Sequence, residues 1–190
     1  TGVQTCALPI FTAMTVLSSC GNKENAAKEQ PAKSTQEIFA MDTYMSLTAY
    51  GSNSEEAVSK AVQEINRLDA MFSVGNEDSD VTKINENGSG EVSEETAFIM
   101  NRAMQVSKET KGAFDITIYP VMELWGFTTK NYRVPESSEI ADVLKHVSYT
   151  NVEVNGQQVT LSDGASIDLG GIAKGYTSSR VIQIDRKSVV

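Results

Sequence analysis

The segment DLGGIAKGY, residues 168–176, constrains this chain more than any other part of its sequence. A short predicted strand presents the carboxylate of Asp168, and a predicted helix over 172–184 follows. The glycine pair between them lets another group come close to the backbone, and a helix start offers free N–H groups and a positive dipole end. Lys174 adds a mobile positive charge about one turn into the helix. The segment suits a phosphate-bearing ligand, although a tight turn with a solvated lysine is the alternative from these residues alone.

The length and composition indicate one domain with a hydrophobic core. The chain has 190 residues, of which 40% are hydrophobic and 22% are charged, and this composition suits a folded domain better than a disordered chain. The formal net charge of -9 repels nucleic acid and anionic lipid, so we expect neither as a partner. No apolar run reaches the roughly 18 residues that a membrane-spanning helix needs.

The cysteines and the histidine exclude several kinds of site. Cys6 and Cys20 both precede the predicted globular region, so that region has neither a disulfide nor a thiolate metal site. The single histidine, His146, rules out a histidine-cluster metal site. It lies in a helical pattern typical of an ordinary surface, so we do not expect a Ser-His-Asp triad built on it.

Both ends of the sequence resemble translated sequencing adapters. Residues 1–10 read TGVQTCALPI and residues 185–190 read DRKSVV, and the codons of two library adapters encode such strings. We therefore exclude both ends from the predicted fold, as one excludes a cloning scar; a genuine signal-peptide start and a genuine tail are the alternative. This interpretation implies a gene cut at both ends, so residues 37–184 are expected to form an incomplete single domain.

Residues 11–20, FTAMTVLSSC, resemble the end of a bacterial lipoprotein signal peptide. A short apolar run followed by small residues is a signal-peptide pattern and not a membrane span. Cys20 is then the expected lipidation site, which predicts a lipid-anchored protein on the extracytoplasmic face of a bacterial cell membrane. A plain secretory signal or a buried strand is the alternative. Residues 21–36 are polar and without hydrophobic period, so they are expected to form a flexible tether.

Hydrophobic periodicity predicts an α+β fold, with a mixed sheet and packed helices. An alternating pattern rich in Thr, Tyr and Phe predicts one strand over 39–50, and Asn155-Gly156 predicts a two-residue hairpin turn within 152–161. Serine N-caps followed by acidic residues predict helix starts at Ser54 and Ser93. The predicted helices are 54–72, 93–111, 135–147 and 172–184, and a further short strand is predicted at 167–169.

Three more segments carry polar residues that would serve a core poorly. They are Met41-Asp42-Thr43, the polar loop of Phe72-Ser73 with Ser79 and Asn85, and GAFDITIYPVMELWGF at 112–127. Together with IDLGGIAKGY, these segments resemble, in order, the motifs of the ApbE family of FAD:protein FMN transferases. The resemblance covers residues 39–184, and the last two motifs are specific. The lipobox also agrees with it, since many members are lipoproteins.

The resemblance implies a set of ligand-binding residues. Those that match positions contacting FAD are Met41, Ala113, Phe114, Asp115, Asp168 and Lys174. Gly171 falls where a residue near the divalent metal lies, through its carbonyl because glycine has no side chain. No residue is assigned as the catalytic base.

The chain departs from the family pattern at two points. A tyrosine that often follows the FS segment is Gly75 here, so one wall contact of the site is expected to be missing. The family's main metal ligands, an aspartate and a nearby threonine, belong to a C-terminal segment that is absent here. Trp125 is interpreted as mainly structural. Residues 163–166 (DGAS) look like the motif that accepts FMN in target proteins, but are expected to form a turn before a strand.

The resemblance implies a Mg²⁺-dependent transfer of FMN from FAD to a Ser/Thr hydroxyl of an acceptor protein, with release of AMP. The metal would neutralise charge on the diphosphate, and Lys174 would assist. The acceptor is expected to be a protein such as a subunit of a membrane redox complex. Two alternatives stay open: an FAD pyrophosphatase that gives FMN to water, and a non-catalytic flavin-binding lipoprotein. The 190-residue chain by itself is expected to be inactive and only marginally stable.

Overall fold

The computed structural model describes residues 31–188, with side chains described up to residue 184. The adapter-like residues 1–10, the lipobox with Cys20 and most of the predicted tether lie outside the described residues. In the second adapter-like segment, residues 185–188 continue the backbone of the last helix, and 189–190 lie outside the description.

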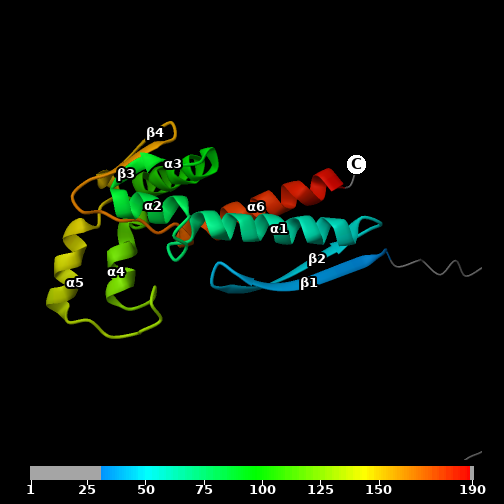
Figure 1. The fold of residues 1–190 in the computed structure, drawn as a ribbon, viewed down its shortest axis with the longest axis horizontal. Helices are drawn as coiled ribbons and strands as arrows, with labels where there is room; N and C mark the ends of the chain where they lie inside the picture. Colours follow the sequence, from blue (N-terminus) through cyan, green and yellow to red (C-terminus); the bar gives the residue numbers. More distant parts are fainter. Residues whose placement is uncertain (1–30, 189–190) are drawn as a thin grey trace, which may run out of the picture. The chain divides into compact units, whose positions relative to one another are not determined.

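The first element is an antiparallel hairpin of β1 (Lys33–Ala40) and β2 (Thr43–Tyr50), shown in blue in Figure 1. β2 alternates between half-buried and exposed residues because one face of the strand packs on a helix and the other is open. The described strands begin inside the predicted tether of 21–36, which is therefore corrected at its C-terminal end. Polar side chains fit the exposed face of β1 while its backbone groups pair with β2.

A turn interrupts the strand that the sequence predicted over 39–50. Ala40 pairs with Thr43, so Met41 and Asp42 form the two-residue connection of the hairpin. Both residues have a positive φ, 52° and 51° respectively. A two-residue hairpin turn with left-handed backbone at both positions matches the twist of its strands, but it is usually made by Asn and Gly. The hydrophobic alternation continues across the turn, and this continuity explains the incorrect prediction of a single strand.

Two long helices lie side by side and form the body of the fold (Figure 1). They are α1 (Ser54–Phe72) and α6 (Gly170–Ser188). α1 begins at the predicted residue, with Glu55 and Glu56 in its first turn where the helix dipole favours negative charge. Its apolar residues recur at helical spacing, and α1 packs on the hairpin and on α6. The prediction of helices at 54–72 and 172–184 is confirmed.

A second group of elements follows α1. It contains α2 (Asp80–Asn87), α3 (Glu94–Glu109) and an antiparallel sheet in the order β3-β5-β4, with β3 (Ser89–Glu91), β4 (Val152–Asn155) and β5 (Gln158–Leu161). The side chains of Ser79 and Ser93 cap α2 and α3 by accepting hydrogen bonds from Thr82 and Thr96. The α+β class is confirmed, and the strands of the described residues form two small antiparallel sheets in place of one mixed sheet.

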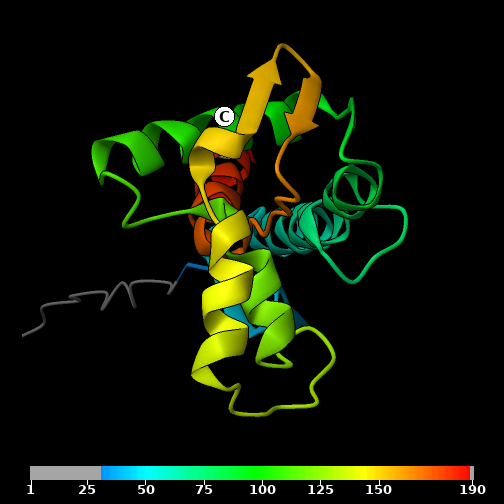
Figure 2. The same cartoon turned by 90° about the vertical axis from the view of Figure 1, so that its left-hand side faces the viewer.

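Short helices occupy much of the chain between α3 and β4. They are η1 (Ile116–Ile118), α4 (Tyr119–Leu124), α5 (Ser137–Val143), η2 (Leu144–His146) and η3 (Tyr149–Asn151). Figure 2 shows α4 and α5 packed beside each other, away from the β4–β5 hairpin. The predicted helix over 135–147 is therefore shorter, since it begins at Ser137 after a capping box and tightens into the 3₁₀ turn η2.

Two local predictions near the end of the chain are wrong. The hairpin turn consists of Gly156 and Gln157, because Asn155 pairs with Gln158. The segment 167–169 is extended but belongs to no sheet. Its backbone is paired with a side chain and with an isolated carbonyl, so apolar alternation alone could not distinguish it from a strand.

The core forms where α1, α2, α3 and the start of α6 meet. Its most deeply buried side chains include Leu68, Ile84, Ile99, Met100, Ile116, Ile167 and Leu169. Burial of this apolar surface supplies the main driving force for folding. Among the described helices, none has both the length and the apolar composition needed to cross a membrane.

The Met41–Asp42 turn generates a stability prediction with opposite signs for two substitutions. Asp42→Gly relieves the left-handed backbone and should raise the free energy of unfolding by about 0.5 kcal/mol, whereas Asp42→Ala should lower it by about 1 kcal/mol. Both substitutions remove the carboxylate, so their difference reports on the backbone alone. Urea denaturation measures both values, and equal effects of Gly and Ala would show that φ is not the cause.

Candidate functional site

A cleft of about 830 Å³ collects every binding residue that the sequence nominated. It lies where the β1–β2 turn, the end of α1, the loop after α3, η1, α4, η2 and the start of α6 approach one another. The seven predicted residues that line it are Met41, Ala113, Phe114, Asp115, Asp168, Gly171 and Lys174. These residues come from three segments that are far apart in the sequence, so their convergence is a property of the fold.

Asp168 caps the helix that carries the rest of its motif. Its Oδ1 accepts a hydrogen bond of 2.7 Å from the backbone N–H of Gly170, and its own N–H donates to the Ile116 carbonyl at 2.8 Å. The free N–H groups expected at this helix start are therefore partly used by the protein. Burial raises the pKa of Asp168 and the nearby Asp42 raises it further, while the Gly170 bond and Lys174 act in the opposite direction.

Asn85 holds the extended segment that presents Asp168. Its side-chain amide accepts a hydrogen bond from the Ile167 N–H at 2.7 Å and donates one to the Ile167 carbonyl at 2.9 Å. A side chain thus provides both bonds that a neighbouring strand would give. Ser79, in the same predicted polar segment as Asn85, also has a structural role, because its buried hydroxyl donates to the carbonyl of Ser73 at 2.6 Å.

The carboxylate of Asp115 is used inside the protein. Oδ1 accepts from the N–H and the hydroxyl of Thr117 at 2.9 and 2.7 Å, and Oδ2 accepts from the N–H of Tyr149 at 2.7 Å. These bonds cap η1 and tie the 113–115 loop to η3. Asp115 lines the cleft as predicted, but its oxygens fix the loop around the cleft and already have protein donors.

Phe114 and Gly171 face each other across the cleft wall. A Cβ placed on Gly171 would lie 3.0 Å from Cε2 of the Phe114 ring, which is tighter than most real Cβ contacts and would require the ring to move by a few tenths of an ångström. The absence of a side chain at Gly171 therefore leaves room for the ring. This is a physical reason for the glycine that does not involve a metal.

Met41 reaches from the hairpin turn to α6. Its sulfur lies 3.6 Å from the Thr177 hydroxyl, and Thr177 is buried. Met41 itself is half-buried and packs against the core. The strained turn therefore fixes both Met41 and Asp42 at the edge of the cleft.

The described residues do not form a complete metal site. Four carboxylates line the cleft, those of Asp42, Asp69, Asp115 and Asp168. However, within residues 31–188 no three Asp, Glu, His or Cys side chains are grouped so that they could hold a metal ion. A divalent cation needs several oxygen ligands. The carbonyl of Gly171 would be one ligand at most, so its predicted metal role stays a prediction.

Comparison with known proteins decides the family. The sequence profile of the ApbE family matches residues 41–190. The chain belongs to the ApbE family. Among curated relatives, the FAD:protein FMN transferase of Haemophilus influenzae is 28% identical over 149 residues, 73% of this chain and 42% of that protein. The Escherichia coli enzyme of the same name is 26% identical and aligns with 92% of this chain and 55% of its own length.

Solved ApbE structures agree with the fold. The ApbE protein of Thermotoga maritima superimposes with a TM-score of 0.79 and 36% identity over 83% of this chain and 53% of that chain. The apo flavinyl transferase ApbE of Pseudomonas stutzeri gives a TM-score of 0.74 at 22% identity, over 83% of this chain and 56% of that chain. The chain thus spans about half the length of the relatives it matches.

Several cleft residues of this ApbE chain were not predicted from sequence. Asp42 and Asp69 add negative charge, and an apolar side is formed by Ile118, Met122, Leu144 and Val147. Ile118 and Met122 lie within the GAFDITIYPVMELWGF motif, so the sequence motif could have indicated that they line the cleft. Leu144 of η2 and Val147, which follows it, could not be recognised as cleft residues from the sequence, because their spacing is that of any amphipathic helix.

The other residues singled out from the sequence lie away from the chemistry. Trp125 is half-buried and stacks on Phe127, with ring centroids 6.4 Å apart. His146 is exposed and its Nδ1 lies 2.6 Å from the carbonyl oxygen of Asp163. Asp163 and Gly164 form the expected turn, although the segment after it is not a strand. Gly75 lies beside the cleft residues Ser73 and Val74 and leaves that position without a ring.

Asp168→Asn is expected to stabilise the fold at neutral pH. A carboxyl whose pKa is raised by burial stabilises the fold below its unfolded pKa, near 3.8, and loses that contribution as the pH rises through the folded pKa. Asn keeps an oxygen for the Gly170 cap and carries no charge. The variant should therefore be more stable than wild type at pH 7, with the difference vanishing toward pH 4. Denaturation curves across this range measure it, and a variant less stable at pH 7 would contradict the expectation.

Gly171→Ala should disturb the cleft through Phe114. The added methyl must displace the ring, so FAD binding should weaken by about tenfold, equivalent to about 1.4 kcal/mol. Phe114→Leu in the same protein should restore part of the loss, because it removes the ring edge that the methyl meets. Gly175→Ala is the matched control, since a Cβ there meets nothing within 4 Å. Equal losses from both alanine variants would point to the helix backbone instead.

Proposed function

We propose that the protein containing this chain is an FAD:protein FMN transferase, and that the cleft binds FAD. The observation that carries the proposal is the convergence of all seven predicted residues on one cleft. The family membership and the names of the matched relatives support it. Because the chain spans about half of those relatives, the activity is proposed for the longer protein.

The proposed reaction breaks a phosphoanhydride bond and forms a phosphate ester. A Ser or Thr hydroxyl of an acceptor protein attacks the phosphorus on the FMN side of FAD, the P–O–P bridge breaks, and AMP leaves with the bridging oxygen. The hydroxyl proton passes to a base that we assign to no described residue. Lys174, exposed at the cleft, would stabilise negative charge on the diphosphate. Met41 and the 113–115 loop would hold the nucleotide in place.

Charge in the cleft favours a cation as a further component. The cleft has four carboxylates and, among the described residues, one lysine, so a bound diphosphate would meet net negative charge. When bound, Mg²⁺ would neutralise part of that charge and polarise the phosphoryl oxygens. The described residues give no complete site for it, so we assign no step to the metal. Its remaining ligands would come from another part of the longer protein.

One experiment distinguishes the proposed FMN transferase from the two alternatives, an FAD pyrophosphatase and a non-catalytic flavin-binding protein. The longer protein is incubated with FAD, Mg²⁺ and an acceptor domain, and covalent flavin on the acceptor and free AMP are measured. A transferase yields both products in equal amounts. Release of FMN to water with or without the acceptor would indicate a pyrophosphatase, and binding without any product would indicate a flavin-binding protein.

Lys174→Ala should weaken FAD binding by losing a charge-assisted contact. Such contacts contribute about 1.5–3 kcal/mol, so the Kd should rise by about 10- to 100-fold. Lys111→Ala is the control, because this exposed lysine neighbours the 112–115 loop and does not line the cleft. Fluorescence titration of FAD measures both, and an unchanged Kd in Lys174→Ala would remove this residue from the site.

The N-terminal sequence supports a proposal about location. We propose that Cys20 is lipidated and that residues after it tether the domain at the extracytoplasmic face of a bacterial membrane, near an acceptor such as a subunit of a membrane redox complex. The support is the FTAMTVLSSC pattern alone. Cells expressing the native signal with labelled fatty acid should label the wild type and not Cys20→Ala. Equal labelling of the two would disprove the anchor.

A further inference from the structure

Asn85 belongs to one of the predicted polar segments but does not line the cleft. Its side chain is half-buried on α2, and its neighbour Ile84 is part of the hydrophobic core. A half-buried amide needs hydrogen-bond partners for both its oxygen and its nitrogen. Asn85 finds both partners on Ile167, which lies 82 residues further along the chain. The residue is therefore committed to the segment that leads into α6.

The pairing of Asn85 with Ile167 requires an amide of this length. The N–H of Ile167 donates to Oδ1 of Asn85 at 2.7 Å, and Nδ2 of Asn85 donates to the Ile167 carbonyl at 2.9 Å. A carboxylate of the same size would lose the donor, and an apolar side chain would lose both bonds. The Ile167 side chain is fully buried, so its backbone groups lie where an unpaired N–H or carbonyl is costly.

The residue that follows Ile167 is Asp168, and a second element holds its backbone. The N–H of Asp168 donates to the carbonyl of Ile116, in η1, at 2.8 Å. The extended segment, which passes beside α2 before α6 begins in Figure 1, is thus bound by α2 through Asn85 and by η1 through Ile116. Successive Cα atoms are linked at about 3.8 Å, so a displacement of Ile167 also displaces Asp168.

One carboxylate oxygen of Asp168 is available to a ligand. Among the hydrogen bonds of residues 31–188, Oδ1 of Asp168 accepts one from the N–H of Gly170 at 2.7 Å, and Oδ2 accepts none. Asp168 lines the cleft, so Oδ2 can accept from an N–H or O–H of a bound molecule. Such a contact needs its oxygen placed to within about 0.5 Å. The Asn85–Ile167 pairing thus helps to decide whether Oδ2 can reach a ligand.

We propose that Asn85 is a positioning residue for ligand binding in the cleft, which acts through Ile167 on the carboxylate of Asp168 and does not contact the ligand. The choice of FAD as the ligand rests on the proposed function, whereas the placement of Asp168 by Asn85 does not. A purely structural role would lower the stability and leave the affinity of the folded protein unchanged. A positioning role lowers the affinity only while Asp168 is present to be misplaced.

A double-mutant cycle on the longer protein separates these two roles. Asn85→Leu removes both bonds at similar side-chain size, and should raise the Kd for FAD about tenfold because the Asp168 contact is weakened. In an Asp168→Ala background, the same substitution should change the Kd by less than about twofold. Fluorescence titration of FAD measures all four proteins. Equal factors in the two backgrounds would overturn the proposal.

The matched control for the cycle is Asn87→Leu. Asn87 is exposed on the same helix and donates to the Lys83 carbonyl within that helix, so its replacement should leave the Kd unchanged. Asn85→Asp is a second variant that keeps the acceptor for the Ile167 N–H, and it carries the same cycle if Asn85→Leu does not fold. Its control is Asn87→Asp, which adds the same charge to the same helix.

Hydrogen exchange at Gly170 tests the placement of Asp168 without FAD. The Gly170 N–H is bonded to Oδ1 of Asp168, so Asn85→Leu should speed its exchange at least about tenfold. The Ala97 N–H, bonded to the Ser93 carbonyl at the start of α3, should exchange as in wild type. Unchanged exchange at Gly170 would contradict the proposal. A wild type that does not bind FAD would contradict the proposed function instead, and exchange at Gly170 would then decide whether Asn85 places Asp168.

Discussion

The pairing of the Asn85 side chain with both backbone groups of Ile167 is the interaction on which the site depends. It fixes the extended segment before α6, where no strand within residues 31–188 lies beside the segment to satisfy its backbone. That segment places Asp168, and Asp168 in turn caps the first turn of α6 through Gly170. The positions of Gly171 and Lys174 follow from the helix start. One amide on α2 thus helps to fix where the predicted binding residues of a helix more than eighty residues later are presented.

Several residues of the predicted binding motifs use their polar groups inside the protein. The Asp115 carboxylate accepts hydrogen bonds from Thr117 and Tyr149, and one oxygen of Asp168 accepts a hydrogen bond from the N–H of Gly170. Gly171 makes room for the Phe114 ring. These residues shape and rigidify the cleft, and a rigid lining is what the proposed positioning of a nucleotide would require. Buried carboxylates near one another are costly for the fold, and the raised pKa of Asp168 is the local sign of that cost.

The long helices and the predicted binding residues that line the cleft could be predicted from the sequence. Periodicity and N-cap chemistry act locally, so α3 begins after its predicted cap Ser93. α1 begins at Ser54 as predicted, but the prediction of Ser54 as its N-cap is wrong, because the N-cap is Asn53. The errors share a cause, which is that tertiary contacts override local pattern. Alternation ran through the Met41–Asp42 turn, and the segment at 167–169 takes strand geometry from a side chain and not from a sheet. Asp69 and Leu144 reach the cleft only through the three-dimensional path of the chain, because their helical spacing is that of any amphipathic helix. Asp42 lies in the predicted Met41-Asp42-Thr43 segment, but its own place at the cleft follows from the turn.

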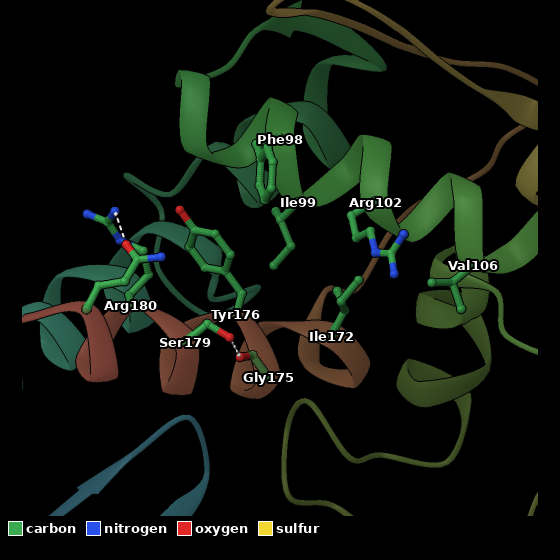
Figure 3. Close-up of a pocket in the computed structure, with 10 residues that line it drawn as sticks. Phe98, Ile99, Arg102, Val106, Ile172, Gly175, Tyr176, Ser179 and Arg180 are labelled. Atoms are coloured by element: carbon green, nitrogen blue, oxygen red, sulfur yellow. Dashed lines mark hydrogen bonds between the residues drawn. The ribbon is translucent and has the colours of Figure 1, made fainter. Parts of the chain in front are cut away.

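α6 contributes residues to three different surfaces of the fold. Its first turns face the cleft with Gly171 and Lys174, Ile172 and Tyr176 line an apolar hollow against α3 (Figure 3), and Val181 and Ile182 line a second hollow against α1 and β2. Between them, Arg67 of α1 joins Glu64 and Glu95, and Arg180 and Tyr176 of α6 bond to the same two carboxylates. The network binds α1, α3 and α6 to one another, and α6 is the element that carries Lys174. The helix that presents Gly171 and Lys174 to the cleft is therefore held in place by polar and charged contacts further along its length.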